Sequence, residues 1–196
     1  MRRADSGGGM QRELVQRAIG GDHGAFTSLV DASIDRQYAL ATLILRDRDR
    51  AQDAVQEALV SAWRDVRSLR DPDAWDAWLH RLTVWACYRL ARKERRKALV
   101  ELHVLPDREP VGAVDHSTRL AERDRIERRL GDLPIDQRAV IVVHFHLGLP
   151  LTEAAAILDI PVGTAKSRLH RALEALRFAM RDEPEGQARL ARERTA

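Results

Sequence analysis

The chain has 196 residues, of which 44% are hydrophobic, so it can bury one large core or two small ones. Ala, Leu, Arg and Glu dominate and β-branched residues do not alternate in runs, which predicts an all-α fold. The formal net charge is only +3, but the basic residues cluster, and such a cluster attracts a polyanion.

The cysteine content and the N-terminus narrow the class of protein. Cys87 is the single cysteine, which excludes an internal disulfide or a multi-cysteine metal site and fits a reducing cytoplasm. No apolar run approaches the roughly 18 residues of a membrane span. Residues 1–12 have no apolar segment after their basic residues and are expected to form a disordered leader. We therefore expect a cytoplasmic protein without membrane insertion, and the true start is either Met1 or Met10.

The first predicted domain, residues 13–98, opens with two helical patterns. Residues 14–19 form a short helix that Gly20-Gly21 ends, and Asp22 caps the next helix. In residues 24–45 apolar side chains recur at helical spacing, which predicts one or two helices that face a core. These side chains are Phe26, Leu29, Val30, Ile34, Ala41, Ile44 and Leu45.

A third helix, residues 49–64, has an apolar stripe and a face of side-chain acceptors. Ala51, Val55, Ala58 and Ala62 form the stripe that packs inward. The acceptors are Asp49, Asp53, Gln56 and Glu57. This face is either solvated, with its charges paired locally, or a docking surface.

An aromatic stripe and a basic run follow the turn at residues 68–74. Trp75, Trp78, Leu82 and Trp85 step by three, four and three, which is typical of a buried helix face, although base stacking is the alternative for such aromatic residues. Residues 89–97 then hold six basic residues and one acid, a density that favours nucleic acid. The candidate contacts with a nucleic-acid strand are Trp85, Arg89, Arg92, Lys93, Arg95 and Arg96.

Residues 99–118 lack helical periodicity and are predicted to be a flexible linker. The linker leads to a second predicted domain, residues 119–181, and a polar tail follows at residues 182–196. Within that domain Leu133-Pro134 precedes a helix over 135–147. Another helix, through Ala154-Ala155-Ala156, must stop at Ile160-Pro161, because proline lacks a donor N–H and disfavours a helical residue before it.

The last predicted helix, residues 164–177, has one apolar and one cationic face. Ala165, Leu169, Ala172 and Leu176 share the inward face, while Lys166, Ser167, His170, Arg171 and Arg177 lie opposite. Two helices joined by a short turn, the second with a cationic face, form a helix-turn-helix that places a recognition helix in the major groove of DNA. The candidate DNA contacts are Thr164, Lys166, Ser167, Arg168, His170 and Arg171, with Arg171 the best candidate for a base contact.

Two blocks of sequence resemble bacterial RNA polymerase sigma factors of the extracytoplasmic-function class. Leu133-Pro134, Gln137-Arg138 and the pattern Ile-Pro-x-Gly-Thr-x-Lys-Ser-Arg-Leu at Ile160 to Leu169 are similar to region 4 of that family. The stretch from Gln52 to Glu57 is similar to region 2.2, and the tryptophan stripe with its basic run resembles regions 2.3 and 2.4.

The resemblance implies three partners for this chain. Core RNA polymerase would bind the acceptor face of residues 49–64, duplex minus-35 DNA the recognition helix, and single-stranded minus-10 DNA the block from Trp85 to Arg96. An anti-sigma factor is a fourth partner that the family suggests. Where the family commonly has asparagine, this chain has Trp85, which implies looser recognition of the minus-10 element. A tryptophan there is either a stacking surface or part of the buried stripe.

Two other function classes remain as alternatives. A stand-alone helix-turn-helix regulator explains residues 130–177 but leaves the block from Asp49 to Lys97 without a role. An enzyme or metal site would rest on His144 and His146, but residues two apart on a helix point about 200° from each other and do not easily share one metal. We expect no enzymatic activity, no cofactor and no bound metal.

Overall fold

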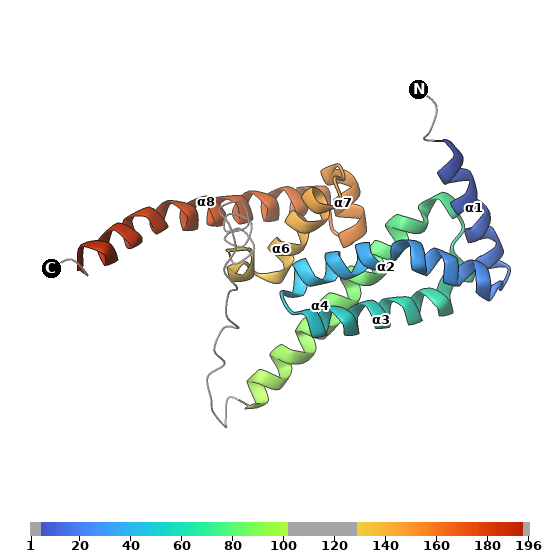
Figure 1. Ribbon diagram of the computed structural model, residues 1–196, viewed down its shortest axis with the longest axis horizontal. Helices are drawn as coiled ribbons and strands as arrows, with labels where there is room; N and C mark the ends of the chain where they lie inside the picture. Colours follow the sequence, from blue (N-terminus) through green and yellow to red (C-terminus); the bar gives the residue numbers. More distant parts are fainter. Residues whose placement is uncertain (1–4, 102–128, 194–196) are drawn as a thin grey trace. The chain divides into compact units, whose positions relative to one another are not determined.

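A computed structural model describes residues 5–101 and 129–193, and these residues form helices and no strand (Figure 1). The chain divides into two compact units. The N-terminal unit contains α1 to α4, and the C-terminal unit contains α6, most of α7, and α8. The all-α fold with two helical domains is thereby confirmed. The predicted linker, from residue 102 onward, lies outside the described residues.

The N-terminal unit is a bundle of four helices. These are α1 (Asp5–Ile19), α2 (His23–Leu45), α3 (Arg48–Asp65) and α4 (Trp75–Glu101), with 3-10 turns at Val66–Ser68 and Pro72–Ala74. Helices α2, α3 and α4 pack against one another, and α1 packs on α2. One core cluster joins all four helices and includes Val15, Phe26, Leu29, Ala62, Trp75, Trp78 and Leu79. Burial of these side chains holds the unit together.

Aspartate caps fix where α2 and α3 begin. The carboxylate of Asp22 accepts a hydrogen bond of 3.0 Å from the backbone N–H of Ala25, and Asp47 does the same for Arg50. The Ala25 N–H and the Arg17 side chain, 2.7 Å away, hold the pKa of Asp22 below its usual value. Helix α2 ends where Arg46 takes a left-handed conformation, with φ of 59°.

The structure corrects several predicted boundaries. The prediction of a disordered leader over residues 1–12 is wrong for residues 5–12, which belong to α1. Residues 24–45 lie in one continuous helix, in which Ile34 is 39% exposed and not in the core. The polar tail from residue 182 continues α8 as far as Glu193. Residues 99–101 extend α4.

A buried polar cluster takes the place of apolar packing between α2 and α4. Gln37 is 1% exposed and lies 3.0 Å from Nδ1 of His80. The hydroxyl of Thr83 donates to Oε1 of Gln37 at 2.9 Å. Hydrogen bonding makes the burial of these polar groups tolerable, and the hydrophobic pattern alone could not have revealed it.

The C-terminal unit is built around the inward face of α8. It contains a helical turn at residues 129–132, α6 (Ile135–Ile141), a π-helical segment (Val142–His146), α7 (Leu151–Leu158) and α8 (Val162–Glu193). Leu130, Leu133, Ile141 and Ala172 form its core cluster, with Leu169 and Leu176 packed against it. The helix predicted over 135–147 is therefore present, but its second half is π-helical.

Arg138 joins α6 to the helical turn before it. Its side chain is 9% exposed, and Nη2 donates to the carbonyls of Gly131 and Leu133, both at 2.8 Å. Carbonyls at a helix end have no partner within the helix and favour a nearby cation. Arg138 therefore fixes the angle at which the chain enters α6 at Pro134.

Replacing Arg138 by Met should lower the free energy of unfolding of the C-terminal unit by about 1–3 kcal/mol, because two carbonyls lose a charged donor. The change keeps the length of the side chain and removes the guanidinium. Urea titration followed by circular dichroism measures the loss. Tryptophan fluorescence would not report on it, since all four tryptophans lie in the N-terminal unit. Arg177→Met, at an exposed position on α8, is the matched control and should change stability by less than about 0.5 kcal/mol.

Candidate functional site

The turn between α7 and α8 consists of residues 159–161. Asp159 adopts a left-handed conformation with φ of 54°, and the N–H of Ile160 donates to the carbonyl of Ala155 at 3.0 Å. This is the hydrogen bond of a Schellman helix end, and Pro161 prevents α7 from continuing. Helix α8 begins at Val162, two residues earlier than the sequence suggested. The connection is as short as a helix-turn-helix requires.

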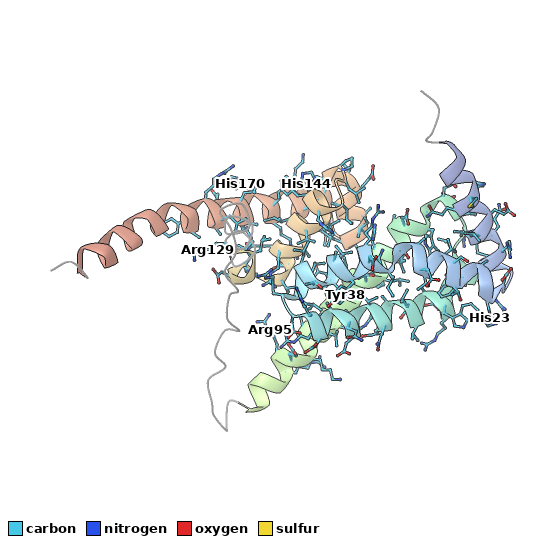
Figure 2. The ribbon with its side chains drawn as sticks, viewed as in Figure 1. His23, Tyr38, Arg95, Arg129, His144 and His170 are labelled. Atoms are coloured by element: carbon cyan, nitrogen blue, oxygen red, sulfur yellow. The ribbon has the colours of Figure 1, made fainter. Side chains whose placement is uncertain are left out.

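The two faces of α8 are as predicted. Ala165 and Ala172 are fully buried, and Leu169 and Leu176 pack against the core of the unit. The opposite face is exposed along Lys166, Ser167, His170, Arg171 and Arg177, and His170 can be located in Figure 2. Packing thus holds α8 with its cationic side toward solvent, where a polyanion can reach it.

Three of the predicted recognition residues have contacts within the unit. The Ser167 hydroxyl donates to the Thr164 carbonyl at 3.0 Å, and Nε2 of His170 lies 3.3 Å from the carboxylate of Glu174, one turn on. Nε of Arg168 lies 3.2 Å from a carboxylate oxygen of Asp136 on α6. Arg168 is therefore turned toward the unit and is less suited to reach DNA than Lys166 and Arg171, which are exposed.

Helix α3 presents most of its predicted acceptors to solvent. The stripe of Ala51, Val55, Ala58 and Ala62 is buried, as expected, and Asp49, Asp53 and Gln56 are exposed on other sides of the helix. Glu57 differs from these three because it is half-buried beside α4.

Val60 and Trp63 extend the exposed face of α3, although neither was predicted to lie on it. Val60 is 56% exposed and lies four residues after Gln56, so the two share one side of the helix. Trp63 is 39% exposed, and its ring packs 4.9 Å from that of Phe26. The signal was present in the sequence, since both residues continue the spacing of Asp53 and Gln56.

The tryptophan stripe on α4 divides into a buried and an exposed part. Trp75 is 1% exposed and Trp78 is 9% exposed, so both belong to the core. Trp85 is 37% exposed, so of its two alternatives the one in which it completes the buried stripe is contradicted. Further along α4 the buried positions are Thr83, Val84, Ala86 and Cys87, and Trp85 falls on the other side. The exposed side continues with the basic residues Arg92, Lys93, Arg95 and Arg96, and Arg95 is labelled in Figure 2.

Two ion pairs connect α3 to α4. The carboxylate of Glu57 lies 2.6 Å from Nε of Arg89, and Arg50 pairs with Glu94. Arg50 also lies 3.2 Å from Asp47, which caps α3. Glu57 was assigned to the polymerase surface and Arg89 to the DNA surface, but the structure pairs them with each other. Each neutralises the other in this conformation.

The residues that suggested an enzyme have local contacts. Nδ1 of His144 lies 2.6 Å from the carbonyl of Leu149, at the end of the π-helical segment. Residues 5–101 and 129–193 contain no group of three or more His, Cys, Asp or Glu side chains that could hold a metal. Burial raises the pKa of the Cys87 thiol to about 12, so this cysteine carries no thiolate at neutral pH.

None of the helices within the described ranges is long and apolar enough to span a membrane.

Comparison with known proteins identifies the family. The model of sigma-70 region 2 matches residues 29–97, and that of sigma-70 region 4 matches residues 123–176. The chain is 35% identical to the ECF RNA polymerase sigma factor SigM of Mycobacterium tuberculosis over 161 residues, which cover 82% of this chain and 79% of the relative. The chain belongs to the extracytoplasmic-function (ECF) sigma factors. The ECF sigma factor SigW of Bacillus subtilis is 30% identical, with coverage of 88% and 98%.

Solved structures agree with this assignment. The sigma factor RpoE of Bartonella quintana, in complex with the anti-sigma factor NepR, superposes with a TM-score of 0.66 at 25% identity and covers 80% of this chain and 96% of its own. CnrH, in complex with the cytosolic domain of CnrY, gives a TM-score of 0.64 at 25% identity, with coverage of 88% and 98%. This chain thus shares both sequence and fold with ECF sigma factors.

The family assignment selects between the two DNA-binding interpretations. A stand-alone helix-turn-helix regulator accounts for the region 4 match but not for region 2, which spans most of α2, all of α3 and most of α4. The sigma factor has both regions, and its function is in transcription initiation.

Proposed function

We propose that this sigma factor binds core RNA polymerase through α3 and holds promoter DNA on α4 and α8. The observation that carries the proposal is the separation of charge between exposed surfaces. Helix α3 exposes Asp49, Asp53 and Gln56, and its exposed basic residues, Arg48 and Arg64, lie at its two ends, whereas α8 exposes Lys166 and Arg171. Acids repel phosphates and basic side chains attract them, so the two surfaces suit different partners.

The outer face of α8 would contact the minus-35 element as a duplex. Its N-terminal residues, including Thr164 and Lys166, would lie nearest the DNA, as in other helix-turn-helix proteins. Arg171 is exposed one turn beyond them and can donate two parallel hydrogen bonds to guanine. Arg168, paired with Asp136, would help to orient α8 on α6.

The exposed side of α4 would hold the opened minus-10 strand. The indole of Trp85 offers a stacking surface, which tolerates any base, and the basic residues that follow it can neutralise phosphates. A tryptophan has no carbonyl and cannot accept a hydrogen bond from a base edge. Promoter selectivity would therefore depend more on the minus-35 element than on the minus-10 element.

The polymerase surface would consist of Asp49, Asp53 and Gln56 together with Val60. Protein–protein interfaces usually have an apolar centre and a polar rim, and acceptors around an exposed aliphatic side chain give this arrangement. Glu57 would contribute less, because Arg89 already pairs with it.

The protein would act in the cytoplasm without enzymatic activity of its own, since the catalytic chemistry of transcription belongs to the polymerase. An anti-sigma factor is a further partner. Support comes from the two similar solved structures, one of which contains a sigma factor bound to the anti-sigma factor NepR.

The Glu57–Arg89 pair allows a separate test of which basic residues contact DNA. A basic residue that contacts single-stranded DNA contributes roughly 0.7 to the slope of log affinity against log salt concentration. Because Glu57 neutralises Arg89, Arg89→Gln alone should leave the slope almost unchanged. Glu57→Gln should steepen it by about 0.7, and the double variant should lose that gain.

Fluorescence anisotropy of the full chain with a labelled single strand, over a range of salt concentrations, gives these slopes. Arg95→Gln is the positive control, because Arg95 is exposed, and it should flatten the slope. If Arg89→Gln flattens the slope as much as Arg95→Gln does, then Arg89 contacts DNA directly in spite of its ion pair.

The proposed function as a whole is tested by adding the purified protein to core polymerase. Transcripts should start at defined promoter positions only when the protein is present. Initiation that is the same with and without it would argue against the proposal.

A further inference from the structure

Arg81 lies beside Trp85 on the exposed side of α4. The central carbon of its guanidinium is 5.6 Å from the centroid of the indole ring, within the range of a cation–π contact. Arg81 is half-buried, and its buried Nε makes no hydrogen bond among the described residues. Buried donors in native proteins nearly always have a partner, so this one requires an explanation.

The spacing along α4 places Arg81 at the end of the cationic surface. Residues 81, 85, 92 and 96 are separated by four, seven and four positions, which puts them on one side of the helix. Arg92 and Arg96 are exposed and extend toward solvent. Arg81 differs from them because it is held against the aromatic ring.

Arg81 also has the chemistry that Trp85 lacks. The indole can stack on a base but donates only through its single N–H, whereas a guanidinium carries five N–H donors in a rigid plane and no acceptor. A base that stacks on the exposed part of Trp85 would bring its edge within reach of this plane. A donor-only side chain discriminates between base edges according to their acceptors.

We propose that Arg81 determines the base preference of the strand-binding side of α4, by donating hydrogen bonds to the unpaired base that stacks on Trp85. The proposal rests on the proposed function, because it requires an opened strand on α4. In an unpaired base, guanine offers two adjacent acceptors, O6 and N7, and cytosine offers O2 and N3, whereas thymine O4 lies beside the donor N3–H. Adenine presents an amino group beside N7. Guanine and cytosine should therefore be preferred to adenine and thymine at one position of the opened strand.

The experiment uses the full chain bound to core polymerase and promoter templates that contain a preformed bubble. Each of the four bases is placed in turn at each unpaired position of one strand, and the affinity of the complex is measured. We expect one position at which templates with guanine or cytosine bind roughly 5- to 100-fold more tightly than templates with adenine. Trp85→Phe should keep this preference, because it keeps the stacking surface.

Arg81→Gln is the decisive variant, because an amide both donates and accepts and pairs well with adenine. It should shift the preference at that position toward adenine and leave the other positions unchanged. Arg95→Gln is the matched control, since it removes an exposed charge from the same helix. It should lower the affinity for the templates with each of the four bases by the same factor. If Arg81→Gln unfolds the chain, Arg81→Lys keeps the charge and should reduce the preference.

Two results would overturn the proposal. One is an unchanged base profile in Arg81→Gln and Arg81→Lys, and the other is a loss of affinity that is equal for all four bases. In both cases the wild-type complex still binds the bubble, so the proposed function remains. If the wild-type protein with core polymerase binds no bubble template better than core polymerase alone, the proposed function itself fails.

Discussion

Core RNA polymerase should no longer retain this sigma factor when Asp53 is replaced by Arg and Gln56 by Ala. Both side chains are exposed on α3, apart from the buried alanine stripe. A polymerase surface that binds the acceptors of α3 must itself be rich in donors and positive charge. An arginine at position 53 would face like charges there, which costs several kcal/mol. Affinity for core polymerase should fall roughly 10- to 1,000-fold, since each 1.4 kcal/mol is a factor of ten.

The control for this prediction is Asp35→Arg on α2, which makes the same charge reversal at another exposed position of the N-terminal unit. Both proteins should keep the helical circular dichroism of the parent, because exposed substitutions generally change stability by less than about 0.5 kcal/mol. Undiminished co-purification of the α3 variant with core polymerase would mean that this face of α3 is only solvated.

Replacing Arg171 by Ala should weaken binding to the cognate minus-35 element by about 1–3 kcal/mol, or roughly 5- to 150-fold. Arg171 is exposed on the outer face of α8, while Ala172 beside it is fully buried and anchors the helix. Removal of a bidentate interaction should also relax the preference at one base pair. Holoenzyme affinities for a set of single-base-pair variants of the element measure both effects.

Arg177→Ala provides the comparison for Arg171. It removes an exposed charge from α8 nearly two turns further from the N-terminus of the helix. If Arg177 binds a phosphate, its removal should weaken all sequences alike and reduce the salt slope by about 0.9. An Arg171→Ala protein with the sequence profile and affinity of the parent would exclude Arg171 as a base contact.

Periodic patterns predicted the helices well, because burial of one face is a repeated signal. The stripe from Ala51 to Ala62 and the stripe from Ala165 to Leu176 are both inward-facing in the structure. The end of α7 was equally predictable, since Ile160-Pro161 restricts the backbone by itself. Each of these inferences depends on neighbours along the chain.

Features that depend on contacts between helices could not be predicted. Trp85 continues the spacing of Trp75 and Trp78, yet those two side chains are buried and Trp85 is exposed. The pairing of Arg168 with Asp136 and of Arg89 with Glu57 joins residues 32 positions apart in each case. No local pattern indicates such a pair, so charged residues assigned to a partner turned out to have partners within the chain.

We propose that this sigma factor directs core polymerase to promoters through two DNA-binding surfaces, on α4 and on α8. The most direct test is in vitro transcription from a promoter library by purified core polymerase, with the parent protein, with Arg171→Ala and without any sigma factor. We predict start sites that share a minus-35 sequence with the parent protein, a relaxed minus-35 sequence with Arg171→Ala, and no such sites without sigma factor. The same set of start sites in all three reactions would contradict the claim.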